Sequence, residues 1–182
     1  MIRVIIVLVN MVFAFSASAQ TTMSNVLKAM PDSLLVYLTE NNRLDCIDFR
    51  EAGMKAEVRN ALDGKSELKV LTDHYAMIQL NEANQVEMRL LDGRGGLLIC
   101  MVCTYGTQIQ ESVIRFYTSS WLPLSTDKYI TLPDWMFTAK LDEKEQKMIL
   151  TCQTAIDRPA MEGQKEHEIM QRNLKWDSQK FK

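Results

Sequence analysis

The chain of 182 residues holds only two histidines, seven glycines and four prolines, and neither sign of charge dominates it. The scarcity of histidine excludes a zinc helix, because His167 is followed four residues later by Gln171 and not by a second histidine. The formal charge of −2, with both signs interspersed, argues against a nucleic-acid or anionic-membrane partner but leaves room for a local patch.

A long apolar run occurs only at the start of the chain. Arg3 precedes the run Val4–Phe15, and the small residues Ala17–Ala19 stand before Gln20. This order is typical of a secretory signal peptide, and the run is shorter than the roughly 20 residues that a membrane-spanning helix needs. We therefore predict a signal peptide over residues 1–19, cleavage between Ala19 and Gln20, and a periplasmic or secreted protein. No cysteine follows the cleavage point, so a lipoprotein is not expected.

The four cysteines, Cys46, Cys100, Cys103 and Cys152, permit three disulfide pairings in an oxidising compartment. Cys100 and Cys103 fall within one apparent strand, where residues three apart face opposite sides and lie too far apart to bond. A redox motif of this spacing normally opens a helix. The favoured interpretation is therefore that these thiols are small buried side chains without disulfides.

Helical signals occupy the first third of the predicted mature chain. Thr22 and Thr39 are placed to cap helices, and Met54, Val58 and Leu62 recur at the spacing of one helix face. From residue 66 onward apolar residues alternate instead, in short runs separated by turn residues. These runs are 68–70, 76–80, 86–90, 97–103 and 113–117. The sequence after them predicts a hairpin over 137–152, a polar helical stretch around 164–171 and a last edge strand at 174–176.

The pattern predicts an α+β fold, with N-terminal helices packed on an antiparallel meander of about six to eight strands. The alternative is a cone-shaped sheet wrapped on helices, as in nuclear-transport-factor-like domains. We find no repeat or linker, so residues 20–182 are expected to form a single domain.

No catalytic, cofactor or metal site is predicted. The glycines at 93–96 open a strand instead of a helix, so they indicate a hairpin turn and not a phosphate loop. Asp73, His74 and Ser112 lack the surroundings of a hydrolase nucleophile. Three carboxylates recur along one helix face and favour a solvated surface over acid–base chemistry: Asp45, Asp48 and Glu51.

One group of aromatic residues is the sole candidate binding surface. It comprises Tyr117, Trp121, Tyr129 and Trp135. Large amphipathic rings are enriched at recognition sites, but they serve equally well to seal a core beneath a long loop. Both roles remain open at this point.

The segment KAMPDSLLVYLTENNRLDCIDFREAGMKAEVRNALDGKSELKVL starts at Lys28 and is followed by MRLL at 88–91, ICMVCTYG at 99–106 and LKWDSQKF at 174–181. With these segments the chain resembles a family of exported proteins from Bacteroidetes-type bacteria, catalogued as domain of unknown function 3256. The resemblance implies a signal-bearing envelope protein. It brings no known activity, cofactor or catalytic residue.

The leading functional hypothesis is therefore a non-catalytic binding or accessory protein of the envelope, whose partner is an envelope protein or an apolar or glycan ligand. One alternative is a small periplasmic hydrolase with a dispersed site that uses His74 or the carboxylates of Asp45 and Asp48. Another is a structural subunit of an envelope assembly. Convergence of His74, Asp45 and Asp48 in one cleft would favour the hydrolase.

Overall fold

The computed structural model describes residues 21–152 and 171–182. In these residues β1 to β7 form a seven-stranded antiparallel meander in chain order, and β8 to β10 form a second, three-stranded antiparallel sheet. The first sheet comprises β1 (Glu57–Arg59), β2 (Lys65–Leu71), β3 (Tyr75–Gln79), β4 (Asn84–Gly93), β5 (Gly96–Tyr105), β6 (Glu111–Thr118) and β7 (Pro123–Leu124). The second comprises β8 (Phe137–Leu141), β9 (Lys147–Cys152) and β10 (Gln171–Lys175). Single-turn 3-10 helices occupy Asp32–Leu34 and Thr126–Lys128.

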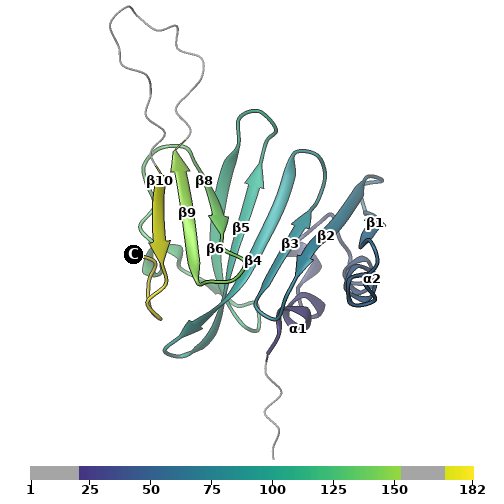
Figure 1. The fold of residues 1–182 in the computed structure, drawn as a ribbon, viewed down its shortest axis with the longest axis horizontal. Coiled ribbons are helices and arrows are strands. Elements are labelled where there is room, and N and C mark those ends of the chain that lie inside the picture. Colours follow the sequence, from purple (N-terminus) through teal and green to yellow (C-terminus); the bar gives the residue numbers. More distant parts are fainter. Residues whose placement is uncertain (1–20, 153–170) are drawn as a thin grey trace, which may run out of the picture.

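Two α-helices precede the sheet, and both begin at the predicted caps. In α1 (Met23–Lys28) the Thr22 side chain accepts a hydrogen bond from the Asn25 N–H. In α2 (Glu40–Glu51) Thr39 and Asn42 form a reciprocal capping box. Figure 1 shows these helices beside β1–β3, whereas the three-stranded sheet lies toward β5 and β6.

The central strands of the meander carry two cores, one on each face. Along β4, Met88 faces the helices and Leu91 faces the second sheet. Along β5, Met101 faces the helices and Cys100 faces the second sheet. All four of these side chains are fully buried. Both faces of the central strands are thus covered, and the described chain is built in three layers.

Polar side chains attach the second sheet to the first. The Leu141 N–H donates to Glu87 Oε2 at 2.8 Å, and the Ala139 N–H donates to Ser112 Oγ at 2.9 Å. Ser112 also shares a 2.8 Å hydrogen bond with the Thr104 hydroxyl. These side chains satisfy edge N–H groups of β8 that would otherwise be buried without a partner.

One predicted helix is wrong. The segment holding Met54, Val58 and Leu62 forms β1 and the turn after it, and β1 pairs with β2. Only Val58 is buried, whereas Met54 and Leu62 are 51% and 61% exposed. The spacing of three apolar residues imitated a helix face, but the Asn60 side chain accepts from the N–H groups of Leu62 and Gly64 and closes a turn instead.

Helices packed on an antiparallel meander are confirmed, although the helices are a minor part of the fold and three strands form a separate sheet. The hairpin over 137–152 and a last strand near the C-terminus are also confirmed. The nuclear-transport-factor-like alternative is not confirmed by this arrangement. The predicted signal peptide, its cleavage site at Ala19 and Gln20, and most of the predicted helical stretch 164–171 lie outside the described residues. Gln171 itself begins β10.

Candidate functional site

The residues tested for catalysis do not converge. His74 lies exposed in the turn between β2 and β3, whereas Asp45 and Asp48 are exposed on α2. Ser112 is buried between the sheets and engaged with Thr104 and β8. Among the described residues there is also no group of three or more side chains suited to hold a metal ion.

The four cysteines carry free thiols. Cys100 and Cys103 face opposite sides of β5, as predicted, and belong to different cores. Burial raises the pKa of both thiols, and it raises the pKa of Cys46 to about 11. Thiols held in this protonated form are poor nucleophiles, which fits a packing role.

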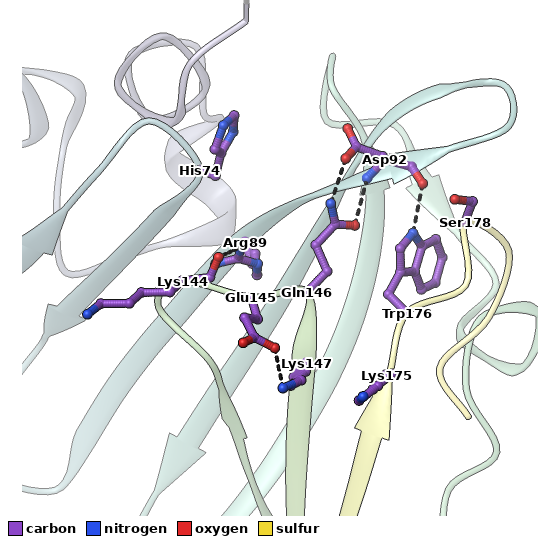
Figure 2. A pocket seen from close by; sticks show the side chains of 10 residues that line it. All are labelled: His74, Arg89, Asp92, Lys144, Glu145, Gln146, Lys147, Lys175, Trp176 and Ser178. Carbon is purple, nitrogen blue, oxygen red and sulfur yellow. Dashed lines mark hydrogen bonds and ion pairs between the residues drawn. The ribbon is translucent and has the colours of Figure 1, made fainter.

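A hollow of about 530 Å³ opens beside the turn between β8 and β9. Figure 2 shows that its walls come from the β2–β3 turn, from β4 and from the second sheet with its C-terminal extension. Its lining exposes polar and apolar surface in about equal measure, although all of the residues except one tryptophan are polar or charged: His74, Arg89, Asp92, Lys144, Glu145, Gln146, Lys147, Lys175, Trp176 and Ser178. The hollow is wide open to solvent and forms a depression in the surface instead of an enclosed cavity.

Arg89 shapes the turn that forms one wall of the hollow. Its Nη1 donates to the carbonyl oxygens of Asp142 and Glu143 at 2.8 Å each, and its Nη2 donates to that of Lys144 at 3.0 Å. The residue is 3% exposed, and its Nε has no hydrogen-bond partner in the described chain. Burial lowers the pKa of the guanidinium, although Asp142 opposes this shift.

Gln146 and Asp92 join the two sheets across the hollow. The Gln146 Nε2 donates to Asp92 Oδ2 at 2.6 Å, and the Asp92 N–H donates to Gln146 Oε1 at 3.1 Å. The indole of Trp176 donates to the Asp92 carbonyl oxygen at 2.8 Å, as Figure 2 shows. Three segments distant in sequence are therefore held together, and the hollow is pre-formed.

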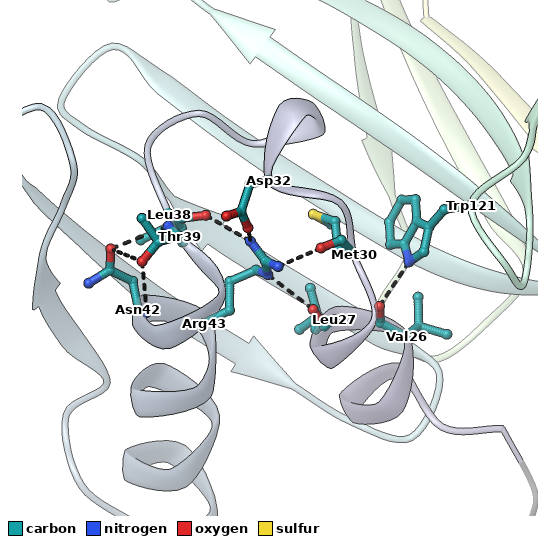
Figure 3. A network of polar contacts seen from close by, with 9 residues as sticks. All are labelled: Val26, Leu27, Met30, Asp32, Leu38, Thr39, Asn42, Arg43 and Trp121. Atoms are coloured by element: carbon teal, nitrogen blue, oxygen red, sulfur yellow. Dashed lines mark hydrogen bonds and ion pairs between the residues drawn. The ribbon is translucent and has the colours of Figure 1, made fainter.

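The structure separates the four aromatic residues into different places. Tyr117 and Trp121 are buried on the helix side with ring centroids 5.3 Å apart, and the Trp121 Nε1 donates to the Val26 carbonyl oxygen at 2.9 Å (Figure 3). Tyr129 packs on the opposite core, against Phe116 at 5.0 Å. Tyr117 and Trp121 thus serve packing, one of the two roles left open by the sequence.

Trp135 alone of the four has an exposed ring, at 40%. The Arg172 guanidinium carbon lies 5.4 Å from its ring centroid, a cation–π contact at the surface. A binding role for Trp135 stays a prediction. The hollow, in contrast, was missed by sequence reasoning, and only the Asp73–His74 turn and the charged turn at 142–146 marked parts of its rim.

Residues 14–180 match the family described as protein of unknown function (DUF3256). The chain belongs to this family. A solved structure, a domain of an uncharacterised protein from Porphyromonas gingivalis W83, is similar at 21% sequence identity and a TM-score of 0.70. The similarity covers 87% of this chain and 95% of that one, and it shows the fold alone. A comparison with curated proteins gave no match.

The hollow of this DUF3256 protein has more cations than anions. Arg89, Lys144, Lys147 and Lys175 line it against two carboxylates, Asp92 and Glu145. Lys147 pairs with Glu145, whereas Lys144 and Lys175 have no ion pair within residues 21–152 and 171–182. Arg89, Gln146 and Trp176 already donate to acceptors of the protein, so the ammonium groups of Lys144 and Lys175 are the donors that this lining offers to a polar ligand.

None of the helices described here is both long and apolar enough to cross a membrane.

Proposed function

We propose that this protein is an exported, non-catalytic binding or accessory protein of the cell envelope, and that the hollow beside the β8–β9 turn holds its ligand. The observation that carries the proposal is the pre-formed polar hollow itself. Asp92, Gln146 and Trp176 fix its walls through hydrogen bonds between distant segments. A site held in place before binding loses less conformational entropy when a ligand arrives.

Export is proposed from the first 19 residues. Arg3, the apolar run Val4–Phe15 and the small residues before Gln20 have the order of a cleavable signal. The charged side chains of the lining favour the polar ligand classes considered above, because an apolar ligand would remove water from Lys144 and Lys175, which have no ion pair in the described chain. A glycan or another polar molecule fits the lining better.

The hydrolase alternative is less well supported. His74 reaches the rim of the hollow, but Asp45 and Asp48 do not line it and instead face solvent on α2. Asp92 and Glu145 do share the hollow with His74, but within the described residues no hydrogen bond or ion pair joins either of them to the imidazole, as the orienting acid of a general base requires.

Native mass spectrometry of the protein, purified gently from the envelope of its own host, tests the proposal. We expect a mass that begins at Gln20 and an adduct that is lost on denaturation. Gln146→Ala breaks the link between the sheets and should abolish the adduct. Gln108→Ala, an exposed glutamine in the β5–β6 turn, is the matched control and should retain it.

Three outcomes would contradict parts of the proposal. A mass that retains residues 1–19 would show that the signal is not cleaved. A bare mature monomer would argue against a bound ligand. A stable larger assembly without a small-molecule adduct would favour the structural-subunit alternative.

A further inference from the structure

We propose that the hollow recognises a negatively charged group, a carboxylate or a phosphate, on its ligand. This inference rests on the proposed function and adds the chemical class of the ligand. Its basis is the presence of four cationic side chains from separate parts of the chain in the lining of one hollow: Arg89 on β4, Lys144 in the β8–β9 turn, Lys147 on β9 and Lys175 on β10.

The two carboxylates of the lining offset only half of this positive charge. Glu145 is paired with Lys147, and Asp92 accepts a hydrogen bond from the neutral Gln146 amide and keeps its charge, so four cations face two anions. Lys144 and Lys175 remain without an ion pair in the described chain. Their ammonium groups are therefore free to contact an incoming anion, and each such contact is a charge-assisted hydrogen bond.

Arg89 supplies a second, independent observation. Only 3% of the Arg89 surface is exposed, although the residue lines the hollow. Its Nε has no hydrogen-bond partner among the described residues. Its other nitrogens are bound to neutral carbonyl oxygens, while the carboxylates of Asp142, Asp92 and Glu145 act on its charge from nearby with no ion pair to it among the described residues. An anion in the adjoining hollow would add a further negative charge beside this buried cation and stabilise it.

The rest of the molecule limits how large the anion can be. The net charge is −2, and α2 presents Asp45, Asp48 and Glu51 to solvent. An extended polyanion or an anionic membrane surface would meet these carboxylates as well as the lysines. The cationic area is confined to one hollow, which favours a small anionic group over a long charged surface.

Titration of the isotopically labelled protein, followed by NMR, tests the ligand class. The probes are inorganic phosphate, galacturonate and galactose, the last being the neutral match of galacturonate. We expect one or both anions, but not galactose, to shift resonances of Lys144, Gln146 and Trp176. Phosphate alone would assign the site to phosphoryl groups, and galacturonate alone to carboxylates.

The double variant Lys144→Ala/Lys175→Ala should weaken anion binding about tenfold or more, and added salt should weaken it further. The control variant Lys28→Ala/Lys128→Ala changes the net charge equally at exposed lysines outside the hollow and should bind as the unmodified protein does. Arg89 is not used for this purpose, because its removal would disturb the turn as well as the charge.

Equal responses to galactose and galacturonate, or no response to either anion, would overturn the inference about charge. The proposed function would survive that result if the adduct of the host-purified protein were still lost in Gln146→Ala. If the adduct persisted in both Gln146→Ala and the lysine double variant, the hollow would not be the site, and both proposals would fail.

Discussion

Arg43 and Arg89 lie on opposite faces of the seven-stranded sheet, and each donates hydrogen bonds to three main-chain carbonyl oxygens. Arg43, on α2, reaches those of Leu27, Met30 and Leu38 and also the Asp32 carboxylate at 2.6 Å (Figure 3). Arg89, on β4, holds the β8–β9 turn. Each buried guanidinium thus fixes irregular backbone that no regular secondary structure could satisfy.

Replacement of Arg43 by methionine should lower the free energy of unfolding by about 3–5 kcal/mol, because three carbonyl oxygens lose their buried donor. Arg43→Lys should recover little, since an ammonium group cannot span the same acceptors. The measurement is urea denaturation followed by circular dichroism. Arg50→Met, at an exposed position of α2, is the control and should change stability by less than about 0.5 kcal/mol. Equal losses in both variants would contradict this account.

Glu87 should make stability fall as pH rises. Burial raises its pKa above the ordinary value of 4.5, although the Leu141 N–H, the Tyr75 hydroxyl and Lys140 oppose the shift. A carboxyl with a raised pKa in the folded state contributes stability that is complete below about 4.5 and is lost as pH rises through the folded-state value. Glu87→Gln cannot titrate, so it should gain stability relative to the unmodified protein between pH 4 and pH 8.

Other carboxyl groups change the stability with pH in the opposite direction, but their effects are the same in Glu87→Gln and in the unmodified protein and cancel in the difference. Hydrogen bonds from Lys55 and Lys65 lower the pKa of Glu57 to about 2, and that of Asp177 is lowered to about 2 chiefly by Lys182. The contributions of these two carboxylates to the free energy of unfolding are lost as pH falls below about 4. Because both proteins contain these groups, a difference curve that does not change with pH would refute the role assigned to Glu87.

Trp121 should matter for stability and not for binding. Trp121→Phe removes the donor to the Val26 carbonyl oxygen and should cost about 1–2 kcal/mol, measured by thermal unfolding. Trp135→Phe, at an exposed ring, should cost close to nothing. If either variant weakened ligand capture without lowering stability, the aromatic binding surface predicted from the sequence would regain support.

Cys152 should be the first thiol to react with iodoacetamide. It is half-buried, whereas Cys46, Cys100 and Cys103 are at most 3% exposed and have raised pKa values. Mass spectrometry of the alkylated protein should show one fast site under native conditions and four under denaturing conditions. Early labelling of Cys100 would mean that the layers separate more easily than their packing indicates.

Local patterns were sufficient where one short segment decides its own structure. Thr22 and Thr39 each cap a helix as predicted, because a side chain and an N–H three residues later settle the cap. Successive side chains of a strand point to opposite faces, so the strand pattern alone placed Cys100 and Cys103 on opposite sides of the sheet. Met54 and Leu62 show the limit, since their spacing imitated a helix while the chain around Asn60 turned instead.

The sequence by itself determined the antiparallel meander, the capped helices, the placement of Cys100 and Cys103 on opposite faces of one strand, and the family, all of which follow from local periodicity and recognisable segments. Only the tertiary structure decided that Trp121 is anchored on Val26, that Glu87 satisfies β8, and that Arg89 shares a hollow with Lys144 and Lys175. The contact between Trp121 and Val26 joins residues 95 positions apart, and the contact between Leu141 and Glu87 joins residues 54 positions apart. Which distant segments meet depends on the path of the whole chain, and no local period records it.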